Sequence, residues 1–210
     1  MYPSRLSCYN TPDMPRVYYV FESELGWVGI AGANGRICRL VLPRSSRRET
    51  AAFLNEGKAR GLVESKHDFS GQADRLAAYF AGKRVDFDCE PDTTGASPFD
   101  VRVWGAAREI GYGEVRSYGW LAARIGQPGA ARAVGQALGR NPVPVIVPCH
   151  RVIRSDGGIG GFGAGLAWKI RLLGMEASGR KADNHRSDGG LPPVGRDSEI
   201  PTHRVQDGGA

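Results

Sequence analysis

Long hydrophobic runs are absent from this sequence of 210 residues. No stretch approaches the roughly 18 consecutive apolar residues of a membrane-spanning helix, so we expect no membrane-spanning segment. The opening stretch, MYPSRLSCYNTPDMPR, also lacks the apolar core of a signal peptide. A cytoplasmic protein is therefore expected, and its 41% of hydrophobic residues suffices to bury one large core or two small ones.

Cysteine is scarce, and its spacing excludes the commonest cysteine-based metal sites. The chain has no CxxC pair among its four cysteines, Cys8, Cys38, Cys89 and Cys149. A zinc site made of cysteines alone is thus not expected, and in a reducing compartment these residues are predicted to be free thiols. Neither a metal nor a cofactor is predicted.

An acidic excess is missing throughout, and the net charge of +6 comes from one segment. Residues 1–100 and residues 179–210 each carry equal numbers of basic and acidic residues, whereas residues 101–178 carry ten basic residues against four acidic ones. Nine of those ten are arginines, whose guanidinium groups suit bidentate contact with phosphate. Charge alone is about equally consistent with a merely basic surface and with a nucleic-acid interface.

The first ninety residues have the pattern of a small α/β domain. Short β-rich runs cover 17–21, 27–31 and 37–42, with a turn signal at Gly32-Ala33-Asn34-Gly35, and helical patterns follow over 47–59 and 72–80. The turn-rich stretch DCEPDTTGASP predicts a boundary between a domain at 1–92 and a second at 93–178. Residues 179–210 lack periodicity and large apolar residues, which predicts a disordered tail.

The second domain has mainly helical patterns. Apolar residues recur at helical spacing from Phe99 to Ile110, and Ser117 is a suitable N-cap for a helix over 118–125. A glycine-containing turn then leads to a helix over 130–140, and this order is typical of a helix-turn-helix. The last helix, AARAVGQALGR, is rich in alanine and glycine. Such a slim helix suits either a DNA groove or tight helix packing, and the arginine excess favours DNA.

The stretch VPVIVPCHRVIRSDGGIGGFG, residues 143–163, contains two competing motifs. Its glycines from Gly158 to Gly163 fit the letters GxGxxG of a dinucleotide-binding loop. That fold needs a second strand with an acidic residue about 20 positions later, and Asp183 stands there inside the predicted tail. Although a helix is predicted over 166–176, the dinucleotide interpretation therefore fails on its context.

The neighbouring Cys149 and His150 indicate instead a nucleophile with a base. The proline-bracketed apolar run 145–147 predicts a buried extended segment, with Cys149 at its end. Because adjacent residues of a strand point to opposite faces, His150 is expected to reach the thiol through a water. Glu176 is the most attractive carboxylate to orient the histidine. Taken without context, a buried structural cysteine is the commoner outcome of such a tripeptide, and a papain-like dyad is a poor match.

Several ordered motifs together resemble the O6-alkylguanine-DNA alkyltransferases, also called methylated-DNA–protein-cysteine methyltransferases. The resemblance is strong over about residues 79–177, and residues 1–80 look like the family's more variable N-terminal domain. The motifs are Tyr79-Phe80, Val103-Trp104, Gly113-Glu114-Val115-Arg116-Ser117-Tyr118, Ala130-Ala131-Arg132-Ala133-Val134-Gly135, Asn141-Pro142, Pro148-Cys149-His150-Arg151-Val152 and Lys169 to Glu176. PCHRV is specific by itself, and the shared order of the motifs adds to that specificity.

The resemblance implies a fold and a reaction. The fold would be an α/β N-terminal domain, a small ribonuclease H-like sheet with helices, followed by a mainly α, winged helix-turn-helix-like domain. The reaction would repair double-stranded DNA by transferring the alkyl group of O6-alkylguanine, and of O4-alkylthymine, to Cys149. The thioether is stable, so each protein molecule would act once, as a monomer and without a cofactor. Its place would be the nucleoid of a bacterium or the nucleus of a eukaryote.

The resemblance also implies residue roles. The catalytic set is Cys149, His150, Glu176, Asn141 and Tyr118. His150 would take the thiol proton through a water, and Tyr118 would donate to the departing guanine. Contacts with the alkylated base are implied for Val152, Phe162 and Gly163. In the minor groove Arg132 would fill the gap left by the extruded base, and the other DNA contacts would come from Ala131, Ala133, Gly135, Tyr118 and Ser155.

Two residues depart from the family's pattern. Members commonly have Tyr at the position of Phe162 and often Ser at that of Gly163, in the loop that closes over the base. Tolerance for bulky alkyl groups is therefore expected to differ. Two other classes stay open at this point, a damage-sensing DNA-binding module without transfer and a cysteine hydrolase indifferent to DNA.

Overall fold

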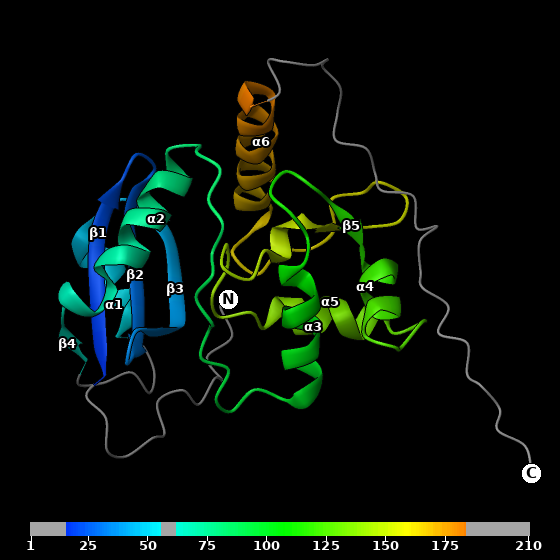
Figure 1. Cartoon of the computed structure of the whole chain (residues 1–210), viewed down its shortest axis with the longest axis horizontal. Coiled ribbons are helices and arrows are strands. Elements are labelled where there is room, and N and C mark those ends of the chain that lie inside the picture. Colours follow the sequence, from blue (N-terminus) through cyan, green and yellow to red (C-terminus); the bar gives the residue numbers. More distant parts are fainter. Residues whose placement is uncertain (1–15, 56–61, 184–210) are drawn as a thin grey trace, which may run out of the picture.

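The computed structural model describes residues 16–55 and 62–183. Within these ranges a sheet with its helices forms one part of the molecule, at the left of Figure 1, and a mainly helical part lies at the right. This arrangement confirms the predicted α/β part followed by a mainly helical one. No helix of the described ranges is long and apolar enough to cross a membrane.

Four strands form the sheet, in the order β3-β2-β1-β4. The strands are β1 (Val17–Ser23), β2 (Gly26–Ala33), β3 (Arg36–Arg44) and β4 (Val63–Glu64). The first three are antiparallel neighbours, and the short β4 pairs with β1 in parallel. Asn34 and Gly35 turn the chain between β2 and β3 at φ 50° and 72°, a left-handed pair that these residue types tolerate best. The three predicted strands and this turn are confirmed.

Helices cover both faces of the sheet because its strands alternate. Val20 and Ala31 lie on one face and pack with Leu54 of α1 (Arg47–Leu54). Phe21 and Ile30 lie on the other face and belong to the hydrophobic cluster that includes residues of α2 (Ser70–Phe80). A short 3-10 helix, η1 (His67–Phe69), comes directly before α2. Side chains one position apart on a strand therefore serve two different layers.

Helix α1 is shorter than the predicted 47–59. Ser46 caps its start by accepting a hydrogen bond from the Glu49 N–H. At the other end, the Asn55 side chain donates to the Ala51 carbonyl, and the helix ends at Leu54. Asparagine side chains compete for backbone hydrogen bonds in this way. The predicted helix was longer because it was based on the spacing of apolar residues, which contains no information on such side-chain bonds. The remaining predicted residues, 56–59, lie outside the described ranges.

The helical part surrounds one slim helix. Its elements are α3 (Pro98–Arg108), β5 (Arg116–Ser117), α4 (Tyr118–Arg124), α5 (Ala131–Gly139), η2 (Cys149–Arg151), β6 (Val152–Ile153) and α6 (Leu166–Asp183). Ser117 caps α4 as predicted, accepting from the Trp120 N–H. Helices α3 and α4 pack against α5, and the Trp104 indole of α3 donates to the Ala137 carbonyl at 2.9 Å. Small residues on α5 allow this close packing.

Helix α6 continues beyond its predicted end at residue 176. It runs to Asp183 and so includes residues 179–183 of the predicted tail. Arginine, lysine and alanine are good helix formers, so the helix persists after its apolar pattern has stopped. The rest of that predicted tail, 184–210, lies outside the described residues.

The sheet part lies directly against the segment that carries Cys149. The Leu40 N–H of β3 donates to the Pro142 carbonyl at 2.9 Å. One hydrophobic cluster also runs through both parts and includes Leu76 of α2, Val147 and Leu172 of α6. The N-terminal part therefore helps to hold the candidate site.

Candidate active site

Cys149 is the first residue of the short 3-10 helix η2. The prediction that the segment before it is extended is wrong. Val145 has φ 77°, in the left-handed region, and only an isolated bridge joins Pro144 to Val147. Pro144 and Pro148 lack an N–H, so this run cannot form a regular ladder. A β-branched residue at positive φ is strained, and such strain is often found beside functional groups. The prediction that the run is buried is confirmed.

The Asn141 amide contacts the thiol. Its Nδ2 lies 3.0 Å from Sγ of Cys149 and 2.9 Å from the Val147 carbonyl, while its Oδ1 accepts from the Val143 N–H at 3.0 Å. Cys149 is 6% exposed, and burial raises the pKa of its thiol to about 11. The hydrogen bond from Asn141 and the charge of Lys169 oppose this rise. The thiol is therefore protonated at neutral pH and needs a base to become a nucleophile.

His150 is a fully buried base. Its Nε2 lies 2.8 Å from Oε1 of Glu176. A carboxylate only accepts hydrogen bonds, so Nε2 carries the proton and Nδ1 carries the lone pair. Burial lowers the pKa of His150, which keeps the ring neutral at neutral pH. Nδ1 has no hydrogen-bond partner among the described residues, and no hydrogen bond there joins His150 to the thiol. The expected lack of direct contact thus agrees with the geometry.

Glu176 of α6 is the centre of a buried network. Arg151 contacts both carboxylate oxygens at 2.9 Å, and the Gly113 N–H donates to Oε2 at 2.9 Å. Tyr79 of α2 donates to Oε1 at 2.7 Å and lies 3.3 Å from Nε2 of His150. Burial opposes ionisation of Glu176, but the hydrogen bonds and charges of His150 and Arg151 outweigh it and hold its pKa well below its usual range. The carboxylate therefore stays charged and fixes the histidine.

Tyr79, Arg151 and Lys169 were not predicted as site residues. Lys169 is fully buried, and its ammonium donates to the Val152 carbonyl at 2.6 Å and to Gly161 at 3.2 Å. Burial lowers the pKa of Lys169 to about 8. All three residues stand inside the motifs that carry the resemblance, which was the only available signal in the sequence.

The glycine-rich loop lies over the thiol. Phe162 and Gly163 line a narrow cavity together with Cys149 and Asn141. Tyr118 donates to the Gly161 carbonyl at 3.5 Å, and a Cβ added at Gly160 would lie 2.6 Å from the Tyr118 hydroxyl. Gly160 also has φ 69°, so only glycine fits there. We call residues 158–165 the lid.

The predicted DNA-contacting residues do not line the thiol cavity. Arg132 projects from α5 and is exposed, and Ser155 is exposed in the turn after β6. The small residues predicted to face DNA on α5, Ala131, Ala133 and Gly135, are half-buried. A Cβ at Gly135 would make ordinary contact with the Tyr118 ring at 3.5 Å. Helix α5 thus exposes Arg132 to solvent, while Leu138 and Gly139 at its other end line the cavity of Cys149.

Other features of the described ranges bear on cysteine and metal chemistry. Cys38, Cys89 and Cys149 form no disulfide there, as predicted, whereas Cys8 lies outside the ranges. No cluster of three or more His, Cys, Asp or Glu side chains suited to a metal occurs in the same ranges. The site itself places a protonated, buried thiol beside a neutral imidazole that a carboxylate orients.

Comparison with known proteins links this site to one family. Residues 98–178 match the family model described as 6-O-methylguanine DNA methyltransferase, DNA binding domain. The chain is 42% identical over 159 residues to the methylated-DNA–protein-cysteine methyltransferase of Mycolicibacterium paratuberculosis, covering 76% of this chain and 91% of that protein. The protein of the same name from Methanosarcina acetivorans is 39% identical over 168 residues, covering 77% and 98%.

Solved structures agree with the sequence relatives. The Mycobacterium tuberculosis OGT in complex with DNA has a TM-score of 0.64 and 42% identity, covering 77% of this chain and 92% of that one. The O6-methylguanine-DNA methyltransferase of Pyrococcus kodakaraensis has a TM-score of 0.60 and 28% identity, covering 76% and 99%. The predicted resemblance is confirmed: this chain belongs to the family of methylated-DNA–protein-cysteine methyltransferases.

Proposed function

We propose that this protein repairs double-stranded DNA by transferring the alkyl group of O6-alkylguanine, and of O4-alkylthymine, to Cys149. Membership of the family gives the reaction class, alkyl transfer from DNA to a cysteine. The observation that carries the choice of residue is the buried thiol of Cys149, 3.0 Å from the Asn141 amide and next in sequence to the oriented His150. The sulfur–carbon bond is stable, so each molecule acts once.

The thiol proton leaves through His150. The neutral ring has its lone pair on Nδ1, so a water between Sγ and Nδ1 would carry the proton from the thiol to the ring. The ionised Glu176 then stabilises the imidazolium. As the proton leaves, sulfur attacks the alkyl carbon and the bond from that carbon to O6 of guanine breaks. The electron pair of the broken bond goes to the base, which must gain a proton to depart neutral.

Tyr118 supplies that proton or a hydrogen bond in its place. Burial raises the pKa of Tyr118, so the phenol remains a donor at neutral pH. The carbonyls of Cys149 and Val152 accept from the guanine amino group. Lys169 already occupies one lone pair of the Val152 carbonyl, which leaves the second for the base. Phe162 and Gly163 close over it, and the narrow cavity requires the lid to move before the base enters.

DNA docks on α5 from the minor groove, to one copy of the protein. Arg132 takes the place of the extruded nucleotide, while Ala131, Ala133, Gly135 and Ser155 lie against the backbone and groove. We further propose that residues 1–92 form a ribonuclease H-like domain and residues 93–178 a winged helix-turn-helix domain. The protein works where the DNA is, on the nucleoid in the case of a bacterium.

Transfer stoichiometry tests this function. Wild type mixed with a duplex that carries one O6-[³H]methylguanine should take up at most one methyl group per molecule. Cys149→Ser should take up none, and Cys89→Ser, a matched change of a half-buried cysteine outside the site, should behave as wild type. Binding of the lesion by wild type without uptake would instead indicate a damage sensor. Uptake by Cys149→Ser, or repeated turnover, would contradict the proposal.

A further inference from the structure

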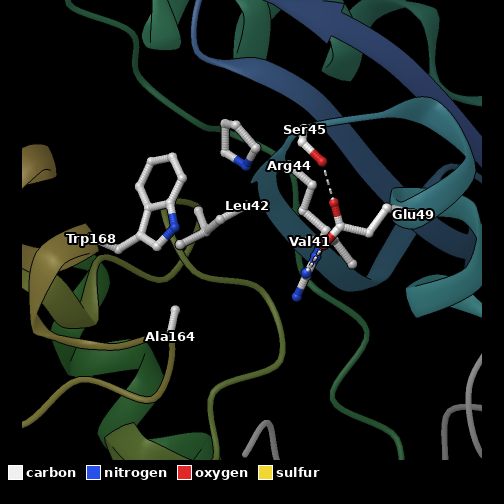
Figure 2. A pocket seen from close by; sticks show the side chains of 8 residues that line it. Val41, Leu42, Arg44, Ser45, Glu49, Ala164 and Trp168 are labelled. Carbon is white, nitrogen blue, oxygen red and sulfur yellow. Dashed lines mark hydrogen bonds and ion pairs between the residues drawn. The ribbon is translucent and has the colours of Figure 1, made fainter.

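A second cavity, of about 300 Å³, lies between β3 and the start of α6. We call it the β3–α6 pocket, and its lining is Val41, Leu42, Pro43, Arg44, Ser45, Glu49, Ala164 and Trp168. Figure 2 shows it from close by, with Trp168 and Ala164 on one side and Arg44, Ser45 and Glu49 on the other. It therefore joins residues of the N-terminal part to residues of the lid and of α6.

This pocket adjoins the cavity of the nucleophile. Ala164 of the lid lines both, so the space beside Cys149 and the β3–α6 pocket border the same residue. The hydrogen bond from the Leu40 N–H to the Pro142 carbonyl fixes β3 against the loop next to Asn141. Val41 and Leu42 directly follow that anchor.

The lining has an apolar body and a polar rim. Val41 and Leu42 are buried, and the Trp168 indole faces the same space. On the rim, Arg44 contacts Glu49 at 2.6 Å. The Nε of Arg44 is buried and has no acceptor among the described residues. An occupant with an aromatic or aliphatic body and a hydrogen-bond acceptor at its far end would match both features.

We propose that the β3–α6 pocket receives the distal part of bulky O6-alkyl groups, in particular arylalkyl groups with a terminal acceptor. The inference rests on the proposed function. The benzylic carbon bonds to sulfur as its bond to O6 breaks, guanine takes up a proton, and His150 receives the thiol proton. Meanwhile the ring extends past Ala164, and its acceptor meets Arg44. The N-terminal part of the chain thereby selects among lesions without contacting DNA.

Substrate-dependent kinetics test this pocket. Transfer rates are measured by intact mass with two substrates, a duplex containing O6-methylguanine and the free base O6-(4-acetylbenzyl)guanine. Ser45→Trp should fill the pocket from its exposed rim and slow acetylbenzyl transfer about tenfold or more, with methyl transfer unchanged. Arg48→Trp, an exposed neighbour outside the lining, should leave both rates unchanged.

Three outcomes would overturn the inference. Equal slowing of both substrates by Ser45→Trp would indicate a general effect, and no slowing of either would show that the pocket is not used. Wild type that accepts methyl but no acetylbenzyl group would also overturn it while the proposed function stands. Loss of methyl transfer in wild type would instead refute the proposed function itself.

Discussion

Replacing Asn141 by alanine should slow alkyl transfer and also weaken the fold, and the two effects can be measured separately. The amide lies 3.0 Å from the sulfur, and a hydrogen bond to a charged group contributes about 1.5–3 kcal/mol. Its loss would raise the thiol pKa by about one to two from its value of about 11. The thiolate fraction at neutral pH, and with it the transfer rate, should then fall about tenfold to a hundredfold.

Two buried partners of Asn141, the Val147 carbonyl and the Val143 N–H, would also lose their hydrogen bonds. We expect a loss of about 2–6 kcal/mol in the free energy of unfolding, measured by urea titration, at about 1–3 kcal/mol for each of the two groups. Single-turnover transfer is then measured under conditions where the variant is folded. Asn141→Asp keeps the acceptor for the Val143 N–H but places a negative charge beside the sulfur. It should therefore be more stable than Asn141→Ala, while its alkyl transfer should be as slow as that of the alanine variant. A folded alanine variant with a rate within twofold of wild type would refute this reasoning.

Further predictions concern the network, the DNA contact and pH. Tyr79→Phe removes one hydrogen-bond donor from Glu176, so the Glu176 carboxylate should stabilise protonated His150 more strongly. The pKa of His150, and with it the lower limb of the pH profile of the transfer rate, should then move to higher pH. An unmoved profile assigns Tyr79 a purely structural role. Arg132→Ala should weaken repair of duplex DNA and leave the reaction with free O6-benzylguanine unchanged, and equal loss in both assays contradicts its role. In the folded protein the pKa of Cys149 is raised from 9.0 to about 11. The difference in free energy of unfolding between wild type and Cys149→Ser should therefore be largest below pH 9 and decline towards pH 11 in denaturation experiments. A difference that does not change with pH would contradict this prediction.

Local signals made much of the fold predictable. Ser117 capped a helix as expected because its hydroxyl needs only the next few residues to act. The Asn34-Gly35 turn followed from the φ values that these residues tolerate. The run 145–147 was predicted as extended because it is apolar, yet the flanking prolines deny it a ladder partner. Its conformation depends on the Asn141 side chain, which bonds across the turn.

The site could be predicted in part for a similar reason. Cys149 and His150 form a specific local motif, and Glu176 was found because carboxylates are rare in its segment. Tyr79 stands 97 residues from Glu176 in sequence, and their bond exists only once the two parts of the molecule have packed. In the sequence, Arg151 was one of the basic residues counted in the excess over 101–178, whereas in the structure its guanidinium is buried against Glu176. Long-range partners of this kind leave no spacing pattern to read.

Peptide mapping by mass spectrometry tests the central claim most directly. After reaction with a duplex containing O6-methylguanine, the digest should contain one methylated cysteine, in the peptide of Cys149, and the DNA should contain unmodified guanine at the former lesion. Cys38 and Cys89 should remain unmethylated. Methyl on either of those residues, or repaired DNA together with an unmodified Cys149, would contradict the account.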